Sequence, residues 1–510
     1  MTTIHIDGNN LTLEDVVAVA QGECTVHLSG TALPRMRDSR ALVDEWVEDG
    51  KVMYGITTGF GEFSNVHIGR DQLEQLQYNL IVSHAIGCGE PIPRHITRIL
   101  MLLRANALAK GYSGIRIETV ELLLAMLNED IIPVIPSQGS VGSSGDLVQL
   151  AHLVCCMMGL EQVWNGDGTR PASEALAASG LSPVRLAAKE GLALINGTQM
   201  MTAYLSWTTA RALSLVRQFD IAGAMTLESL LGTTNACDPA LHAVRPHPGQ
   251  QKVARNILRL LENSEIRESH RENHDAVQDA YSLRCMPQVH GASRDCINYV
   301  EEVLLREMNA ATDNPLIFAE TGRLIEGGNF HGQPVALAAD FLGIALAELA
   351  NISERRVERM VNGKLSGLPR FLTSQGGLNS GFMIAQYTAA SLVSENKVLA
   401  HPASVDSIPT SANQEDHNSM GSIGARKAWQ IMKNAEHVLA VEFMTAAQAL
   451  DFHAPMTMGA GTREAHRLLR ASVPHLDADR LMFGDLGASA ELVRKNSILE
   501  QVERTIGNLE

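Results

Sequence analysis

Residues 137–150 read SQGSVGSSGDLVQL, a segment with three glycines and four serines among its fourteen residues. An apolar run, IIPVIP, stands directly before it, and a pattern with helical spacing begins at its end. Glycine and serine form helices poorly, whereas the rest of the chain is rich in residues that favour helices. The segment therefore marks a break between helices, or a backbone shape that only small residues permit.

Composition alone leaves several interpretations of this segment open. Serine and aspartate cap helices and glycine suits tight turns, so the segment can be a turn that leads into a helix. Glycines before a helix can also expose backbone N–H groups to an anion, but the lysine of a phosphate-binding loop is missing. A serine-hydrolase elbow does not fit, because no G-x-S-x-G occurs here.

A further interpretation is covalent and involves the triplet Ser143-Ser144-Gly145. If the backbone bends tightly, the amide nitrogen of Gly145 can attack the carbonyl carbon of Ser143, and loss of water closes a five-membered ring. A second loss of water, from Ser144, leaves an exocyclic methylidene, which is an electrophile made from the chain itself. Gly145 must lack a side chain for this approach, and the flanking glycines permit the strained bend.

The bulk composition is that of a globular protein. The chain has 510 residues, of which 45% are apolar and 19% charged, so wholesale disorder is excluded. A net charge of -16 without any Lys/Arg run argues against a nucleic-acid partner. The N-terminus, MTTIHIDGNN, lacks the features of a signal peptide, and the long apolar stretches carry charges. We therefore expect a cytoplasmic protein without a membrane span.

Neither the cysteines nor the histidines are spaced like metal ligands. The seven cysteines are odd in number and unpaired in spacing, which predicts buried free thiols in a reducing compartment. The chain has no HExxH sequence, and the histidines are scattered. We therefore expect no metal site.

Helical periodicity runs through most of the chain after Asp71. Several helices are apolar on more than one face, which indicates burial in a bundle or at a subunit interface. The pattern predicts a mainly α fold with two domains. Residues 1–195 would carry a glycine-rich lid loop, at 51–65, and the loop quoted above; residues 196–510 would form a long-helix bundle with C-terminal helices. The long predicted helices cover 198–232, 251–262, 292–311, 331–362, 378–400 and 420–452.

The segment GSVGSSGDL resembles the one that forms the methylidene-imidazolone (MIO) group of the aromatic amino acid ammonia-lyase family. The usual triplet there is Ala-Ser-Gly; Ser143 replaces the alanine, which changes only the substituent on the ring. Other segments, between about Leu11 and about Phe452, resemble the family in the same order. They are YGITTGFG, NLIVSHAIGCGEP, ALINGTQ, QDAYSLRCMPQVHG, TDNPLIF, GNFHGQP, GLNSGFMIAQYTAA and SVDSIPTSANQEDHNSMG.

The resemblance implies a fold, a cofactor and a reaction. The fold would be the ammonia-lyase/fumarase-like one, with long central helices packed as a homotetramer whose active sites are shared between chains. The cofactor would be MIO, formed autocatalytically from Ser143-Ser144-Gly145, with no external cofactor. The members that act on histidine are the most similar, so the expected reaction is the non-oxidative deamination of L-histidine to trans-urocanate and ammonia, in histidine breakdown.

The family's catalytic residues match positions in this sequence. Tyr54 matches the base that removes the β-proton, and Tyr281 a tyrosine close to the MIO; from the residues alone, Tyr54 could also be a tyrosine buried beside a glycine loop. Arg284 matches the residue that holds the substrate carboxylate, for which a guanidinium fork is well suited. Three further substrate-binding positions match by resemblance: Asn196, Gln278 and Phe330.

Substrate choice would depend on a smaller set of residues. The pair Ser83-His84 and the carboxylate of Glu415 match the members that act on histidine, and a carboxylate can pair with an imidazole N–H. Met383 matches a wall of the pocket, although it could equally be a core residue. Thr57 stands where those members commonly have asparagine. The alternatives left open are therefore a tyrosine or phenylalanine ammonia-lyase and a 2,3-aminomutase of the same family.

Overall fold

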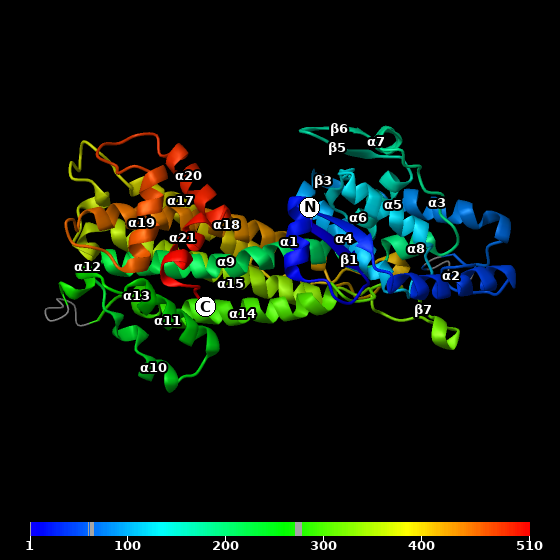
Figure 1. Ribbon diagram of the computed structural model, residues 1–510, viewed down its shortest axis with the longest axis horizontal. Coiled ribbons are helices and arrows are strands. Elements are labelled where there is room, and N and C mark those ends of the chain that lie inside the picture. Colours follow the sequence, from blue (N-terminus) through cyan, green and yellow to red (C-terminus); the bar gives the residue numbers. More distant parts are fainter. Residues whose placement is uncertain (1, 60, 62–65, 271–277) are drawn as a thin grey trace. The chain divides into compact units, whose positions relative to one another are not determined.

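The protein is described by a computed structural model that covers residues 2–59, 61, 66–270 and 278–510. These residues are mainly helical (Figure 1), which confirms the predicted fold class. They form two compact units: residues 1–207, 301–340 and 402–426 make the first, and 208–300, 341–401 and 427–510 make the second. The two continuous domains expected from sequence, 1–195 and 196–510, are a different division and stay a prediction. Part of the predicted lid loop, at positions 60 and 62–65, lies outside the described residues.

The first unit combines helices with small two-stranded sheets. Strands β1 and β2 pair in parallel, and the other three pairs are antiparallel. The helices are α1 (Leu13–Gln21), α2 (Ala32–Glu48), α3 (Leu73–His84), α4 (Arg94–Ala109), α5 (Ile117–Asn128), α6 (Leu147–Met157), α7 (Ala172–Ala178) and α8 (Glu190–Ile195). The strands are β1 (Thr2–Ile6), β2 (Cys24–Leu28), β3 (Cys88–Pro91), β4 (Pro136–Gln138), β5 (Gln162–Asn165), β6 (Gly168–Pro171), β7 (Leu316–Phe318) and β8 (Arg323–Ile325).

Helix α4 is buried along almost its whole length. Every residue from Ile96 to Ala109 is buried, and the helix contacts α1 and α5. It carries polar side chains into the interior, and these need hydrogen-bond partners there. The Asn106 amide, for example, donates to the Met308 carbonyl oxygen at 2.9 Å and accepts from the Gly8 N–H at 2.9 Å. Polar contacts thus join α4 to segments far away in the sequence.

Four long helices contribute residues to both units: α9 (Gln199–Ser229), α14 (Met286–Glu307), α15 (Gln333–Val361) and α18 (Gly421–Asp451). The predicted helices 198–232, 331–362 and 420–452 agree with α9, α15 and α18 to within a few residues at each end. Helix α14 begins earlier than the predicted 292–311. Strong apolar periodicity in long segments explains this agreement, because it outweighs local propensity.

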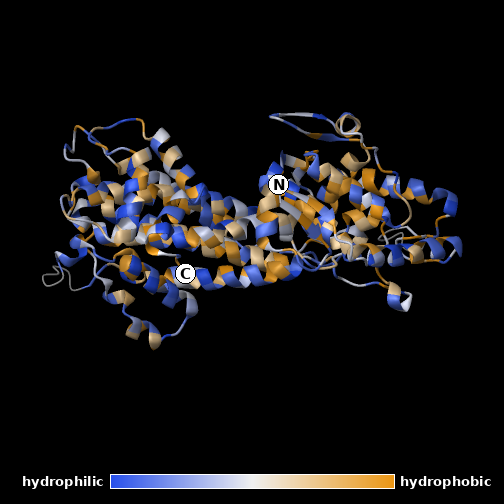
Figure 2. Ribbon diagram, viewed as in Figure 1, coloured by the Kyte–Doolittle hydropathy of each residue, from blue (hydrophilic) through white to orange (hydrophobic). Residues whose placement is uncertain are grey.

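Apolar and polar residues alternate along these helices, as Figure 2 shows. Within the described part of the chain, α15 is the one helix that is long and apolar enough to cross a membrane by length and composition. However, 67% of its most apolar window is buried inside the protein, as in the core helix of a soluble protein.

The second unit contains helices and connecting loops, and no strand among its described residues. Its remaining helices are α10 (Pro239–Ala243), α11 (Pro248–Leu260), α12 (Glu265–Glu268), α13 (Tyr281–Arg284), α16 (Gly363–Ser366), α17 (Met383–Leu399), α19 (Ala460–Ser472), α20 (Phe483–Arg494) and α21 (Ser497–Ile506).

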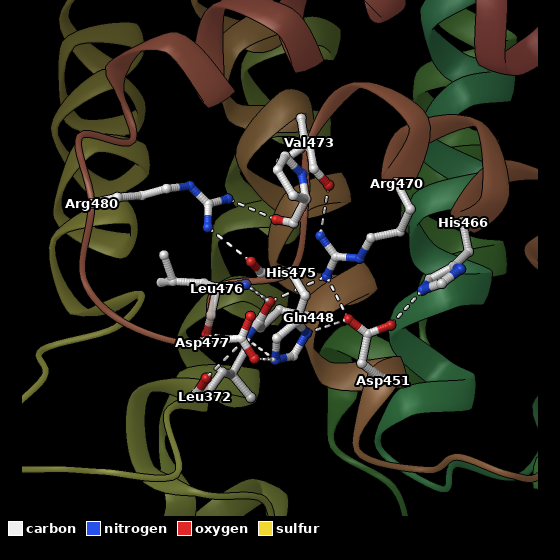
Figure 3. Close-up of polar contacts among 11 residues, drawn as sticks. Leu372, Gln448, Asp451, His466, Arg470, Val473, His475, Leu476, Asp477 and Arg480 are labelled. Atoms are coloured by element: carbon white, nitrogen blue, oxygen red, sulfur yellow. Dashed lines mark hydrogen bonds and ion pairs between the residues drawn. The ribbon is translucent and has the colours of Figure 1, made fainter.

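A charged cluster fixes the C-terminal end of α18 in this unit (Figure 3). The Asp451 carboxylate accepts hydrogen bonds from His466 Nε2 at 2.7 Å, Arg470 Nη2 at 2.8 Å and His475 Nδ1 at 2.6 Å. Burial alone would raise the pKa of Asp451, but these donors outweigh it and lower the value to about 2. The cluster thus ties α18 to α19 and to the segment that follows it.

The cysteines are only partly as expected. All seven are free, and Cys24, Cys155, Cys156 and Cys237 are buried, as predicted. The prediction of burial is wrong for Cys88, which is exposed on the short strand β3.

Candidate active site

The loop of residues 139–146 connects β4 to α6 and is held from two sides. The Ser140 hydroxyl donates to Gln149 Oε1 at 2.7 Å, which ties the loop to the following helix. On the other side, the Met420 N–H donates to the Val141 carbonyl oxygen at 2.9 Å. The loop is therefore packed between a helix and a distant segment of the chain, unlike a turn on the surface.

The backbone at the triplet is compatible with glycine alone at its last position. Gly145 has φ +78°, and a Cβ there would overlap the carbonyl oxygen of Gly197. The Asp146 N–H donates to that oxygen at 2.7 Å, and the Gly197 N–H donates to the Ser144 carbonyl oxygen at 3.3 Å. No described residue accepts a hydrogen bond from the Gly145 N–H. These features meet the conditions for ring closure: a tight bend, no side chain at Gly145, and a Gly145 nitrogen that donates no hydrogen bond to a described residue.

Two buried oxygen atoms beside the triplet have no hydrogen-bond partner within the described residues: Asp146 Oδ1 and Asn196 Oδ1. The other Asp146 oxygen accepts from the N–H groups of Met200 and Met201, both at 2.9 Å, at the start of α9. Burial raises the pKa of Asp146 to about 7, although these two N–H groups lower it. Buried polar atoms without a partner are rare in folded proteins, so this position is suited to a bound water or ligand.

Glu415 reaches the triplet from a segment 271 residues further along the chain. Its Oε1 accepts a hydrogen bond from the Ser144 hydroxyl at 3.4 Å, and its Oε2 accepts one from the Thr410 hydroxyl at 2.7 Å. Backbone hydrogen bonds between Thr410 and Glu415 close this turn. One carboxylate oxygen is thus fixed by its own loop, and the other faces the serine that would supply the methylidene.

His84 is the last residue of α3 and is half-buried beside the exposed Ser83. Its Nδ1 lies 2.7 Å from the Leu80 carbonyl oxygen, which can only accept, so Nδ1 carries the proton. Burial lowers the pKa of His84, against smaller opposing effects of the Leu80 hydrogen bond and the Glu415 charge. The imidazole is therefore neutral at pH 7, and its Nε2 is an acceptor to which no described residue donates.

Tyr54 is half-buried in the glycine-rich loop, and its hydroxyl accepts from the Gly61 N–H at 3.5 Å. Burial raises the pKa of Tyr54; the Gly61 hydrogen bond lowers it, and acidic residues, Glu415 among them, raise it further. Thr57 has a structural role here: its hydroxyl donates to the Lys51 carbonyl oxygen at 2.6 Å and accepts from the Met53 N–H at 2.9 Å. In this unit Tyr54 is thus a protonated phenol at neutral pH.

The structure brings most of the predicted site residues of the first unit to one region. The Glu415 carboxylate contacts Ser144, and its charge reaches Tyr54 and His84. Asn196 directly precedes Gly197, which is hydrogen-bonded to the triplet. Phe330, also in the first unit, is half-buried in the turn before α15. The roles of all these residues stay predictions.

The remaining predicted residues belong to the second unit. Arg284 ends the short helix α13, and its guanidinium lies over the ring of Tyr281, 4.7 Å from the centroid. The Tyr281 side chain is 71% exposed, so it is available to another molecule. Gln278 is exposed, and Met383 is half-buried at the first position of α17. Their roles also stay predictions.

Three residues near the triplet were not identified from the sequence: Arg104, Asp146 and Thr410. Arg104 interrupts the apolar run ILMLLRANALA, and a charge inside such a run was the available signal. Asp146 follows the triplet directly, where an aspartate is typical of a helix cap, but its side chain makes no capping hydrogen bond. Thr410 gives no comparable signal, because its contact with Glu415 depends on the conformation of the loop.

Comparison with known proteins places the whole chain. A family model described as aromatic amino acid lyase matches residues 11–471. The histidine ammonia-lyase of Alkaliphilus metalliredigens (strain QYMF) is 55% identical over 509 residues, which cover 100% of both chains. The solved structure of histidine ammonia-lyase from Trypanosoma cruzi has a TM-score of 0.92 at 43% identity, and the match covers 99% of this chain and 96% of that one. The structure of tyrosine aminomutase from Streptomyces globisporus has a TM-score of 0.93 at 36% identity, with 99% of each chain covered. The chain belongs to the aromatic amino acid lyase family.

Proposed function

We propose that this protein is a histidine ammonia-lyase, which converts L-histidine to trans-urocanate and ammonia. Relatives of that name, at more than half identity over the full length, support the proposal. The observation that carries it is the placement of the Glu415 carboxylate 3.4 Å from the Ser144 hydroxyl. A carboxylate there can pair with the imidazole N–H of a substrate whose amine meets the electrophile formed from Ser144.

The electrophile would be MIO, made from the triplet without any oxidant. The Gly145 nitrogen forms a bond to the Ser143 carbonyl carbon. The carbonyl oxygen leaves as water with one hydrogen from the Gly145 nitrogen and one from the Ser144 nitrogen. The Ser144 side chain then loses its hydroxyl together with the α-hydrogen as a second water, which leaves the methylidene. Once formed, this group supplies an electrophile that assists departure of the substrate amine.

The protonated ring of the substrate, which carries two N–H groups, would meet two acceptors, Glu415 and the Nε2 of His84. The neutral state of His84 supports this, because a protonated imidazole would repel an imidazolium and would lack the acceptor. Ser83 would support the His84 ring, since its hydroxyl lies 3.1 Å from Nδ1. Tyrosine and phenylalanine offer no ring N–H, so the half-buried carboxylate would lose that partner.

The other groups would hold and deprotonate the substrate. Arg284 would bind the carboxylate, and Asn196 would contribute its unpaired side-chain oxygen. Gln278, Tyr281, Phe330 and Met383 would complete the pocket, with Tyr281 next to the electrophile. Tyr54 would be the base; because its pKa is raised within the first unit, it needs a positive charge or dipole from outside that unit to act at neutral pH.

We also propose a cytoplasmic homotetramer with active sites shared between chains. Helix α17 supports the assembly, since Ala389 and Asn396 are the buried residues among its seventeen. Large apolar side chains on it stand exposed in the single chain: Ile384 is 53% exposed and Tyr387 60%. Exposed apolar surface of this kind is typical of subunit interfaces. Sedimentation of the purified protein would measure its mass, and a monomer would contradict the proposal.

The test is product analysis with three substrates offered separately: L-histidine, L-tyrosine and L-phenylalanine. The conjugated acrylate is followed by absorbance, with the Ser144→Ala variant as the control. Urocanate from histidine alone, absent with the variant, is the expected result. Coumarate or cinnamate would instead establish a tyrosine or phenylalanine ammonia-lyase, and a β-amino acid would establish a 2,3-aminomutase. The similarity to the structure of a tyrosine aminomutase favours the second of these alternatives.

A further inference from the structure

Arg104 is a buried cation in the middle of α4. Its side chain is fully buried, and its hydrogen bonds go to uncharged oxygens: the carbonyls of Ala193 and Asn196 (the latter at 2.8 Å) and the Gln199 side chain at 2.7 Å. Throughout the described part of the chain, no carboxylate lies within ion-pair distance of it. Burial lowers the pKa of Arg104 to about 10, although the charge of Asp313 raises it, so the group is a cation at neutral pH. Burying such a charge is unfavourable unless the surrounding dipoles are fixed around it.

The three acceptors of Arg104 surround one glycine. Ala193 and Asn196 precede Gly197, and Gln199 follows it. A Cβ on Gly197 would lie 2.5 Å from Gln199 Oε1 and 2.6 Å from Arg104 Nη1. The glycine therefore sits in a cage in which the guanidinium fixes the chain on both sides of it.

Thr312 completes this cage from another segment. Its hydroxyl oxygen accepts from Gln199 Nε2 at 2.8 Å and would lie 2.7 Å from a Cβ on Gly197. Gln199 is thus held at both ends of its amide, by Arg104 and by Thr312, so its own freedom to move is small.

Gly197 in turn holds the triplet. Its carbonyl oxygen accepts from the Asp146 N–H and its N–H donates to the Ser144 carbonyl oxygen, so it grips the chain on both sides of Gly145. A continuous series of contacts leads from the guanidinium of Arg104, through Gly197, to the nitrogen that has to attack in ring closure. A displacement of reacting atoms by about 1 Å slows a reaction by about a hundredfold.

We propose that Arg104 is a positioning residue for ring closure, which holds residues 193–199 so that Gly197 keeps the Gly145 nitrogen close to the Ser143 carbonyl carbon. The inference rests on the proposed function, because it assumes that the ring forms. Arg104 takes no part in the bonds that form or break: the nitrogen–carbon bond closes within the triplet, and the Ser143 oxygen leaves as water.

The test measures ring closure directly, without activity. The full-length protein is expressed and digested, and the mass of the peptide that contains residues 137–150 is measured by mass spectrometry. The closed ring makes this peptide lighter by two water molecules. We expect the wild type to be closed. Arg104→Gln is expected to close about a hundredfold more slowly, and Arg104→Lys, which keeps the charge and fewer hydrogen bonds, is expected to recover part of the rate.

A milder variant keeps the inference testable if Arg104→Gln does not fold. Thr312→Val removes the acceptor of Gln199 with little change in volume, and it is expected to slow closure in a protein whose circular dichroism and melting are native. Thr462→Val is the matched control, since its buried hydroxyl donates to Glu228 at 2.6 Å, and both residues belong to the second unit, whereas the loop belongs to the first. It is expected to close as fast as the wild type.

The possible results separate the two proposals. Closure at the wild-type rate in folded Arg104→Lys and Thr312→Val would overturn the positioning role and leave the proposed function standing. Equal slowing in Thr462→Val would also overturn it, since the effect would then follow any loss of a buried hydrogen bond. A wild-type peptide of unmodified mass would overturn the proposed function, and this inference with it.

Discussion

Replacement of Glu415 by glutamine tests the basis of substrate choice with almost no change in volume. The structure indicates how the new side chain would lie. Thr410 donates to one carboxylate oxygen at 2.7 Å, and the single oxygen of glutamine would take over that role. The amide NH₂ would then replace the oxygen that faces Ser144, so a donor would meet the N–H of the substrate imidazole.

The magnitude follows from the kind of hydrogen bond that is lost. A hydrogen bond to a charged group contributes about 1.5–3 kcal/mol and one between neutral groups about 1 kcal/mol. Because the amide donor cannot replace the carboxylate acceptor, Glu415→Gln should lose the whole hydrogen bond to the charged group and weaken transition-state binding of histidine by about 1.5–3 kcal/mol. That corresponds to about a 10- to 150-fold decrease in kcat/KM for histidine. Any trace activity on phenylalanine should rise, because the uncompensated carboxylate is gone.

The assay is urocanate absorbance under steady-state conditions, with Glu326→Gln as the control. Both carboxylates raise the pKa of Tyr54 through their charge, so both substitutions should lower that pKa. The rise of activity with pH that accompanies deprotonation of Tyr54 should therefore move to lower pH in both variants. Only Glu415→Gln should lower kcat/KM for histidine relative to phenylalanine. Equal ratios in both variants would refute the assignment of Glu415 to the imidazole.

Three further predictions concern ring formation and stability. Gly145→Ala should leave the triplet unmodified, as measured by peptide mass. The control is Gly180→Ala, which should not affect the ring, because Gly180 also has a positive φ (+69°) but no atom lies near its Cβ position. A closed ring in Gly145→Ala would contradict the steric argument. Lys189→Met removes the partner of the buried Asp313 carboxylate, 2.7 Å away, and should lower the free energy of unfolding by about 3–5 kcal/mol in urea titrations; a change below about 1 kcal/mol would show that Asp313 is compensated otherwise. Folding lowers the pKa of Asp451 from 3.8 to about 2, so the stabilisation of the fold by this carboxylate is complete above pH 3.8 and is lost as the pH falls towards 2. Asp451→Asn should therefore be less stable than the wild type at pH 6 and approach it at pH 2. An equal difference in stability at both pH values would speak against this role.

The features predicted from the sequence are those that repeat along the chain. Helices α9, α15 and α18 could be predicted because about thirty residues of apolar periodicity define each of them. Thr12, which is followed by the acidic residues Glu14 and Asp15, is typical of a helix start, and it forms a capping box with Asp15 at the start of α1. The strand β4 could not be predicted, for the opposite reason: its sequence, PSQ, has neither alternation nor strand-forming residues, and it is extended because it pairs with β3.

The candidate site could be predicted only in part, because contacts between distant segments are not visible in a sequence. The resemblance identified Ser144 and Glu415, but the atoms that join them come from positions 271 residues apart. Thr410 was not identified, although it fixes one oxygen of Glu415, since threonine in a loop is ordinary. Arg104 lies 92 residues from the backbone oxygen it holds, and its role depends on where α8 ends.

This loop differs from an ordinary turn in the amount of structure that restrains it. A surface turn keeps its shape with its own hydrogen bonds and glycines. Here Met420 holds Val141, Gly197 holds both sides of Gly145, and Gly197 itself is caged by Arg104 and its partners. Each restraint orders groups that would otherwise gain entropy by moving, so the conformation persists only because the folded unit over-determines it. Such a strained bend lets the weakly nucleophilic amide nitrogen of Gly145 approach the carbonyl carbon of Ser143. The same restraints explain why a chain rich in helix formers places its smallest residues between β4 and α6.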